Sequence, residues 1–378
     1  MIITRLSFSI LTMACCSVLG FSNPATAQVS LSDASINTLD GLTVERAVYD
    51  STRDLIYATV SSASVNTNGD SIAVVNPNNG DFNFVTGAGR NPNAISISDD
   101  DSLVYLGVNG DFGFRTFDPA TSQFGAIQPL TVSTGLGVFI NPATAEDFAI
   151  QPGNPGTVVV SADTAGNSAN GNLQVFNETG LIDSIGFQDE EANSILFADS
   201  NTLLGLRSRV STAPLVEYLF DGAELIEQNV INTTDLFFTS SGDTLELSGG
   251  NLFSSGGAVV TQDFELVGAF AGRLDVEVIE PIESLGITYL FNEGVLSVFD
   301  TDTFLLIDSL QTDLPSSLGE GLQARDLFVA GESLALVDEA GGLTLISGVP
   351  IGVSVPEPSC LTVLVAIGMC FCSRRERR

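Results

Sequence analysis

The sequence predicts an all-β protein, a seven-bladed β-propeller with an N-terminal signal helix and a short C-terminal membrane segment. Two observations predict the ring. Between Gln28 and Val355, Gly, Asn, Asp, Ser and Thr interrupt the apolar residues every few positions, which is typical of short strands joined by tight turns. A similar strand also returns about every 46 residues, and the 328 residues of this body have room for seven copies.

The first repeated motif is an apolar strand that follows a polar turn, as in DLIYATV at residues 54–60. Its seven copies are centred on Tyr57, Tyr105, Val159, Leu204, Phe253, Tyr289 and Ala335. The steps between these centres range from 36 to 54 residues, which is the spacing expected of blades with four strands each.

The second motif is a strand that runs into an Asn or Asp turn and then into another apolar residue. Its copies end at Phe82, Phe124, Ile182, Ile226, Val267 and Leu306. Asn and Asp suit such turns because their side chains bond to nearby backbone and tolerate left-handed geometry. Each pair of motifs therefore supplies four strands.

The seventh copy ends with GLTLIS at residues 342–347 and lacks a fourth strand. We therefore expect a strand from residues 28–43 to complete it. This strand would close the ring, remove the free edges that would otherwise invite aggregation, and give a propeller domain that spans residues 28–350. A β-helix would need a shorter and stricter period, and tandem sandwiches would not give seven similar units.

Residues 93–124 show one blade most clearly and resemble YVTN-type and WD-repeat-like bacterial surface propellers. This resemblance implies an architecture rather than an activity.

Composition excludes several kinds of chemistry. The chain has no His, Lys or Trp, so zinc sites with His ligands and Ser-His-Asp triads are excluded. All five cysteines lie in the terminal segments (Cys15, Cys16, Cys360, Cys370 and Cys372), so the body has no disulfide. Its 8 Arg against 44 Asp and Glu give a charge of −36, which disfavours nucleic acid and suits solubility outside the cell or cation binding.

Residues 1–27 have the features of a secretory signal peptide. Arg5 supplies the positive start, an apolar run extends over residues 6–21, and Ala25 and Ala27 are the small residues of a cleavage site before Gln28. We therefore expect export. The alternative is a lipoprotein acylated at Cys15, for which the preceding apolar run is short.

The C-terminal segment predicts membrane anchoring. The apolar stretch at residues 361–372 is shorter than the ~20 residues of a relaxed membrane-spanning helix, so flanking residues or local thinning would have to help it span. The cations that follow should stay in the cytoplasm and keep the body outside: Arg374, Arg375, Arg377 and Arg378. A buried C-terminal strand with a basic tail is the alternative, but it does not explain why the apolar stretch lies between prolines and arginines.

Residues 355–378 resemble the PEP-CTERM sorting signal of bacterial exported proteins. The three parts occur in the family's order: Pro356-Glu357-Pro358, an apolar segment and a basic cluster. The resemblance implies recognition by an exosortase-type membrane enzyme and cleavage near residues 356–358. It further implies release or transfer of the body to the cell surface or the extracellular matrix, in a biofilm or envelope setting.

Acidic groups within the body are the candidate metal sites. Asp99-Asp100-Asp101 and the pair Asp300 and Asp302 offer the oxygen ligands that calcium prefers, although neither has an EF-hand loop pattern. Both fall where hairpin turns are expected, so solvated turns are the alternative, and the acidic run at residues 189–191 reads as a blade-connecting loop. We expect no other cofactor.

Arginines are scattered through the body: Arg46, Arg53, Arg90, Arg115, Arg207, Arg209, Arg273 and Arg325. Most should pair with nearby carboxylates, and Arg207 with Arg209 is the one candidate anion site.

The expected function is non-catalytic binding of protein or polysaccharide through loops that the stacked blades hold rigidly. The competing hypothesis is a secreted hydrolase that uses paired carboxylates in the central channel. Two or more buried, convergent Asp or Glu in that channel would favour the enzyme, and a channel lined by small and apolar residues would favour the binding module.

Overall fold

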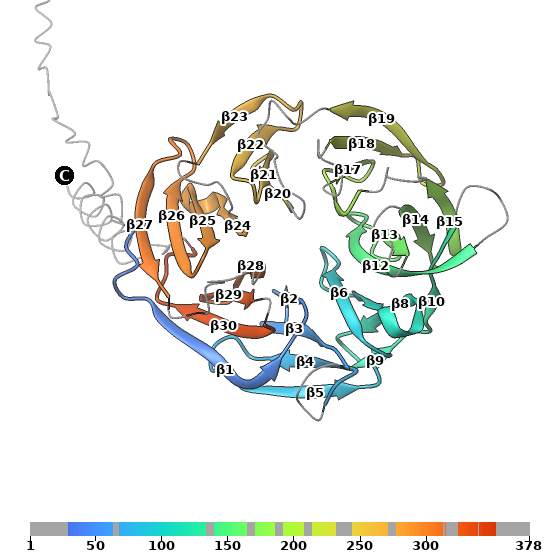
Figure 1. The fold of residues 1–378 in the computed structure, drawn as a ribbon, viewed down its shortest axis with the longest axis horizontal. Coiled ribbons are helices and arrows are strands. Elements are labelled where there is room, and N and C mark those ends of the chain that lie inside the picture. The colour runs from blue at the N-terminus through green and yellow to red at the C-terminus, as the bar shows by residue number, and fades with distance from the viewer. Residues whose placement is uncertain are drawn as a thin grey trace, which may run out of the picture.

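The computed structural model describes residues 29–352 except 63–67, 134–139, 165–170, 186–191, 208–213, 232–243, 271–276, 313, 315–323 and 339. These residues form seven antiparallel sheets arranged radially in a ring (Figure 1). The chain is a seven-bladed β-propeller.

The strands follow one another from the centre of the ring outward in each blade. Blade 1 contains β2 (Ala47–Asp50), β3 (Leu55–Val60), β4 (Ser71–Val75) and β5 (Phe82–Thr86), and blade 2 contains β6 (Pro92–Ile97), β7 (Val104–Val108), β8 (Gly113–Asp118), β9 (Gln123–Phe124) and β10 (Gln128–Pro129). Blade 3 contains β11 (Thr131–Ser133), β12 (Ile140–Ile150), β13 (Val158–Thr164), β14 (Gly171–Asn177) and β15 (Gly180–Ile185), and blade 4 contains β16 (Ser194–Phe197), β17 (Thr202–Leu206), β18 (Leu215–Phe220) and β19 (Leu225–Ile231).

The remaining three blades follow the same plan. Blade 5 contains β20 (Leu245–Ser248), β21 (Asn251–Ser254), β22 (Ala258–Thr261) and β23 (Leu266–Ala269), and blade 6 contains β24 (Val278–Ile282), β25 (Ile287–Asn292), β26 (Val295–Asp300) and β27 (Leu306–Gln311). Blade 7 contains β28 (Ala324–Ala330), β29 (Ser333–Asp338), β30 (Gly342–Ser347) and, as its outer strand, β1 (Ser35–Thr43).

Strand β1 closes the ring. It pairs antiparallel with β30, with Ser35 opposite Ser347 and Thr38 opposite Thr344, whose hydroxyl groups are 2.9 Å apart. The strand expected within residues 28–43 is therefore β1. Blade 7 combines strands from both ends of the chain, so the ring has no separate first and last blade.

The first sequence motif marks the second strand of every blade. Its seven centres lie in β3, β7, β13, β17, β21, β25 and β29, and all seven side chains are buried. They are buried because the second strand packs against blades on both sides, which requires an almost continuously apolar strand.

The second motif marks the hairpins between third and fourth strands. The Asp118 carboxylate accepts hydrogen bonds from the N–H groups of Ala120 and Thr121, and the Asp300 carboxylate accepts one from Thr303 N–H at 2.7 Å. One residue in each of these turns has a positive φ: Gly80, Ser122, Gly180, Gly222, Phe264 and Phe304. A polar side chain at the start of the turn, acidic or amide except for Thr261 in blade 5, thus stabilises the left-handed geometry that follows it.

Blades 2 and 3 depart from the four-strand plan. The outer strand of blade 2 is split into β9 and β10, and β11 adds a strand beside β12. At the break, a Cβ on Gly125 would lie 2.4 Å from Thr116 Oγ1, so only glycine allows this close approach. The extra segments explain the longest repeat step, from Tyr105 to Val159.

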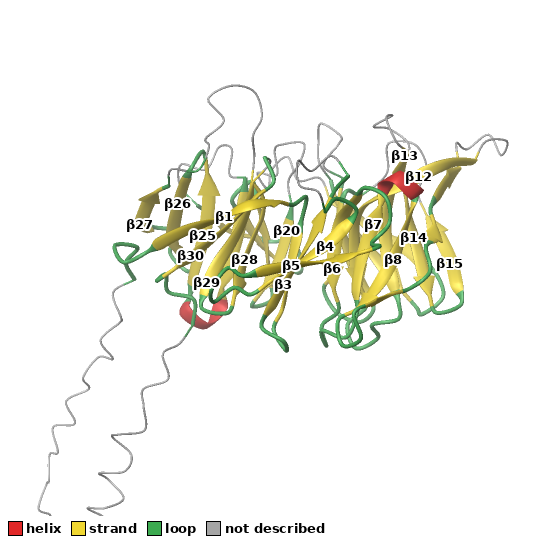
Figure 2. Cartoon of the chain, turned by 90° about the horizontal axis from the view of Figure 1, so that it is seen from below, coloured by secondary structure: helices red, strands yellow, loops and turns green. Residues whose placement is uncertain are grey.

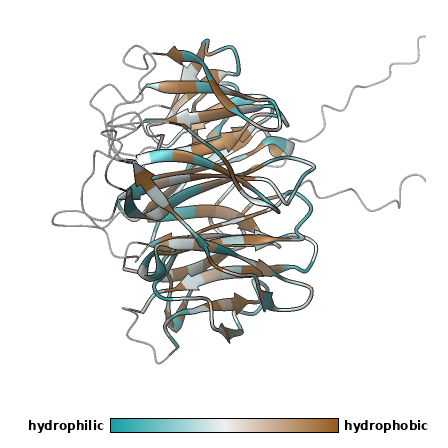
Figure 3. Ribbon diagram, turned by 90° about the vertical axis from the view of Figure 1, so that its right-hand side faces the viewer, coloured by the Kyte–Doolittle hydropathy of each residue, from teal (hydrophilic) through white to brown (hydrophobic). Residues whose placement is uncertain are grey.

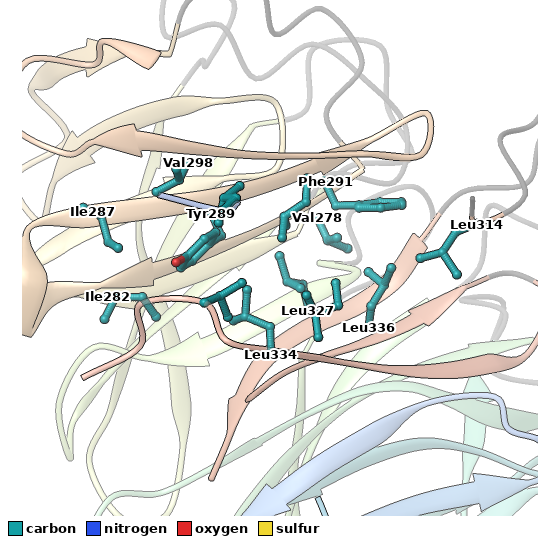
Figure 4. Close-up of a cluster of buried hydrophobic side chains, with 14 residues drawn as sticks. Val278, Ile282, Ile287, Tyr289, Phe291, Val298, Leu314, Leu327, Leu334 and Leu336 are labelled. Atoms are coloured by element: carbon teal, nitrogen blue, oxygen red, sulfur yellow. The ribbon is translucent and has the colours of Figure 1, made fainter. Parts of the chain in front are cut away.

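The core lies between neighbouring blades. Figure 4 shows one such layer, in which Tyr289 and Phe291 of blade 6 face Leu334 and Leu336 of blade 7. Apolar residues run along the strands, whereas the turns are mostly hydrophilic (Figure 3). Each fully buried Leu or Phe stabilises the fold by about 1.5–3 kcal/mol, so stacking of the blades stabilises the ring.

The ring has two different faces. First strands run toward the face that carries the short turns at residues 51–54, 249–250 and 331–332, and both described ends of the chain lie there. We call this the terminal face; the 3-10 helix η3 (Glu283–Leu285) marks it in Figure 2. The opposite face, which we call the long-loop face, carries the 3-10 helix η1 (Asn109–Asp111) and the ends of the strands that flank residues 61–70, 232–244 and 312–323.

Some sequence predictions lie outside the described residues. These are the signal peptide with Ala25 and Ala27, the motif Pro356, Glu357 and Pro358, the apolar segment at 361–372, and the four terminal arginines. Within the described part of the chain, no helix has the length and apolar character needed to cross a membrane.

Candidate functional site

A cavity occupies the central channel of the ring. Its volume is about 810 Å³, and the first strands of all seven blades line it. Six acidic residues and two arginines line this space: Asp99, Glu146, Asp147, Glu246, Glu280, Asp326, Arg46 and Arg325. The other lining side chains are mainly apolar, including Val48, Ile95 and Phe328.

Asp326 joins blade 7 to blade 1. Its carboxylate accepts a hydrogen bond from the N–H of Ala47 at 3.0 Å and a second from Nε of Arg46 at 2.7 Å. Its side chain is 12 % exposed, whereas that of Arg46 is 35 % exposed. The pair therefore lies where solvent screens it only partly.

The same position in other blades makes the same kind of bond. The Asp147 carboxylate of blade 3 accepts a hydrogen bond from Ile195 N–H of blade 4 at 2.8 Å. The Ser194 hydroxyl of blade 4 accepts one from Leu245 N–H of blade 5 at 3.2 Å. A polar side chain at this position of the first strand thus satisfies a backbone donor of the next blade, as buried N–H groups require.

Glu246 and Glu280 in the channel differ in their hydrogen bonding. Glu280 of β24 accepts a long hydrogen bond of 3.4 Å from Val329 N–H of β28. Glu246 of β20 has no hydrogen bond or ion pair in the described part of the chain, and its side chain is exposed to the channel. Glu246 is therefore the carboxylate most open to a ligand.

Enclosure by the ring raises the pKa values of three of these carboxylates. Burial raises the pKa of Asp147 to about 6, although the bond from Ile195 and the charge of Arg46 oppose the rise. Burial, with the charges of Glu280, Asp147 and Asp326, raises the pKa of Glu246 to about 8. Burial raises the pKa of Glu280 to about 7, and the bond from Val329 opposes it. Solvent that reaches the exposed Glu246 reduces this effect.

Arg46 responds in the opposite sense to the same charges. The Asp326 carboxylate is the largest cause that raises the pKa of Arg46, and Asp147 and Glu246 add to it. The guanidinium thus stays charged and partly neutralises the acidic wall.

Carboxylates from several blades face this channel, but Asp147, Glu280 and Asp326 are only partly buried and Glu246 is exposed, so the criterion of buried, convergent carboxylates is met only in part. Most of them also already have a structural partner. Asp147, Asp326 and Glu280 each hold a backbone N–H of the next blade. Such bonds fix the carboxylates and reduce their freedom to act as nucleophile or base. The channel therefore combines acidic and apolar walls.

Sequence comparisons add no relative. No protein-family model matches the chain, and no curated protein is detectably similar to it.

The acidic run at residues 99–101 holds blades together on the terminal face. Asp101 accepts hydrogen bonds from the Ser51 hydroxyl at 2.7 Å and from the N–H and hydroxyl of Thr52, both at 2.9 Å. Asp99 accepts one from Gly153 N–H of blade 3 at 2.9 Å. In the described ranges, no group of three acidic side chains is arranged to hold one metal ion.

The other predicted site residues have local partners. Asp300 starts a turn and Asp302 is exposed beside it, whereas the run at 189–191 and the arginines 209 and 273 lie outside the described residues. Five ion pairs involve the remaining arginines: Arg46–Asp326, Arg53–Asp50, Arg90–Asp111, Arg207–Glu227 and Arg325–Glu45. Arg115 instead lies over the ring of Phe124 at 4.9 Å.

The channel carboxylates are the site residues that sequence reasoning missed. Their signal is a polar residue directly before an apolar residue within the first strand, as in Asp147-Phe148, Ser194-Ile195 and Asp326-Leu327. This signal is weaker than the two repeated motifs, which lie in the second and third strands.

Proposed function

We propose that this propeller is an exported, exosortase-sorted protein of the cell surface or extracellular matrix that binds protein or polysaccharide without catalysis. One observation carries the proposal: the packed body ends close to the two expected processing sites. Val29 and Leu31 pack in the layer between blades 6 and 7, directly after the expected cleavage at Ala27. Val349 and Ile351 pack in the same layer, five residues before Pro356.

These limits make cleavage compatible with an intact ring. Removal of residues 1–27 and of the segment after Pro358 would leave every described strand in place. The exosortase-type enzyme is the expected processing partner, and the C-terminal segment is the expected membrane anchor before cleavage.

The character of the channel guides the choice of ligand. A wall with six acidic residues and two arginines repels anionic polymers and accepts hydrogen bonds from hydroxyl or ammonium groups. We therefore expect a neutral or amine-bearing glycan, or a basic protein surface, and no nucleic acid.

Cell fractionation tests the sorting proposal. In cells that carry an exosortase-type enzyme, the body should accumulate outside the membrane as a shortened form. In cells without that enzyme, or with Pro356 and Pro358 both replaced by Ala, it should remain in the membrane at full length. If the body leaves the membrane to the same extent in all three kinds of cell, the sorting proposal is wrong.

A glycan array tests the binding proposal separately, because binding of the purified body would identify its ligand class.

A carboxylate-based hydrolase is the second candidate. Glu246 and Asp147 have pKa values raised to different extents, which is how one carboxyl stays protonated as an acid while another is ionised. Hydrolysis of glycosides by the wild type, lost in Glu246→Gln and retained in Glu224→Gln on an outer turn, would favour this candidate. If the wild type hydrolyses no substrate in a broad panel of glycosides, the hydrolase candidate is rejected in favour of the binding module.

A further inference from the structure

Both described ends of the chain are fixed at one place on the terminal face. The N–H of Leu31 donates to the Asp308 carboxylate of β27 at 2.8 Å, and the hydroxyl of Tyr289 in β25 donates to the carbonyl of Pro350 at 2.7 Å. The two ends also touch each other, because a Cβ on Gly348 would lie 2.5 Å from the carbonyl oxygen of Asp33. Blade 6 thus holds both ends.

The C-terminal residues take the place of a turn. In blade 3 the long connection at residues 151–157 carries Pro155, whose carbonyl accepts a hydrogen bond from Tyr105 of the preceding blade at 2.7 Å. In blade 7 the corresponding turn is only residues 331–332. Pro350 therefore accepts the bond from Tyr289 that such a turn would accept, and the direction of the leaving chain is fixed by packing.

The link from this point to the expected anchor is short. Residues 353–360 separate the last described residue from the apolar segment. Eight extended residues reach at most about 28 Å. The terminal face near blade 6 must therefore stay within this distance of the anchor.

We infer that, while the C-terminal segment anchors the protein, the ring is polarised, with its terminal face near blade 6 toward the lipid surface and its long-loop face directed away. This inference rests on the proposed anchor. It directs the long-loop end of the channel away from the lipid and toward solvent. Asp326 and Arg46 lie at this end, where β28 and β2 begin, and Asp147 lies there because it accepts the hydrogen bond from Ile195 near the start of β16.

Two exposed glutamates form a matched pair of reporter positions. Glu283 precedes β25 on the terminal face, and Glu293 follows β25 on the long-loop face. The six residues of β25 separate them by roughly 20 Å. The body contains no cysteine, so Glu283→Cys or Glu293→Cys gives a single labelling site once Cys360, Cys370 and Cys372 are replaced by Ser.

The test measures energy transfer from a dye at either position to acceptor lipids. Each variant of the chain from Gln28 to Arg378 is reconstituted into phosphatidylcholine vesicles, after its melting has been matched to the wild type. We expect stronger transfer from position 283, by an amount that corresponds to a separation about 20 Å shorter than from position 293. A flexible insert of thirty Gly and Ser residues after Gly352 should remove the difference.

Equal or reversed transfer in molecules that float with the vesicles overturns the inference and leaves the anchor intact. Failure of the chain to float with vesicles overturns the anchor of the proposed function, and the inference with it.

Discussion

The carboxylate of Asp326 in blade 7 accepts a 3.0 Å hydrogen bond from the backbone N–H of Ala47 in blade 1. The same carboxylate pairs with Arg46, so one side chain of blade 7 holds two consecutive residues of blade 1 at this junction.

Removal of this carboxylate should destabilise the whole ring. Asp326→Ala leaves the N–H of Ala47 and the guanidinium of Arg46 without their acceptor, which costs about 2–3 kcal/mol of unfolding free energy. Urea denaturation measures this change, and Asp302→Ala, on an exposed turn, should change the free energy by less than about 0.5 kcal/mol. Equal effects of the two substitutions would show that Asp326 does not join the blades.

Tyr289 should hold the C-terminal residues in place. Tyr289→Phe removes the donor to Pro350 and should cost about 1 kcal/mol. It should also speed proteolysis after residue 347, because the segment 348–352 then detaches more often. Tyr105→Phe, which removes the similar bond to Pro155, should cost a similar free energy without affecting proteolysis near the C-terminus.

The channel should make the ring more stable in mild acid. The pKa of Glu246 in the folded protein is about 8, above its ordinary value of 4.5, so the folded state keeps a proton that the unfolded state loses between these pH values. The free energy of unfolding therefore falls as pH rises through this range, and Asp147 and Glu280 act in the same sense at pKa values of about 6 and about 7.

Substitution of Glu246 isolates this effect from the general repulsion of an acidic protein. Glu246→Gln should flatten the dependence of the urea midpoint on pH between 5 and 8.5 and raise the midpoint at pH 8.5. Glu224→Gln removes one exposed charge outside the channel and should leave the slope nearly as in the wild type. If the urea midpoint depends on pH with the same slope in the wild type, Glu246→Gln and Glu224→Gln, then Glu246 is not the group that binds the proton.

Ser122 is a turn residue that glycine should improve. It is exposed and has a φ of 55°, a conformation that costs a side chain about 1–2 kcal/mol. Ser122→Gly should therefore raise the melting temperature, with a net gain of up to about 1 kcal/mol once the entropy of glycine is included. Ala120→Gly in the same turn, which has no positive φ, should lower it.

The sequence predicted the ring because its signals are local and repeated. Seven buried second strands need apolar residues, and turns before the fourth strands need Asn, Asp or Gly, so each blade carries both patterns. Closure by β1 was also predictable, since the last repeat lacks one strand. The split of β9 and β10 was not, because it depends on close approaches at Gly113 and Gly125 that involve distant neighbours.

The channel carboxylates could not be predicted from the sequence, for a different reason. Asp147, Glu246, Glu280 and Asp326 come from four blades and converge only in the closed ring. The acidic residues that stand out in sequence, such as Asp99-Asp100-Asp101, instead hold turns together. Density of acidic residues along the chain therefore did not mark the place where carboxylates meet in space.

A single engineered disulfide between β1 and β30 tests whether β1 closes the ring. Thr38 and Thr344 are paired across β1 and β30, and residues 28–355 contain no other cysteine, so T38C with T344C can form a single disulfide between sequence positions 306 apart. We expect this pair to oxidise in the folded body and to add up to about 5 kcal/mol of stability that a reductant removes. Two thiols that stay free in the folded, oxidised protein, as expected for T38C with T303C in blade 6, would contradict it.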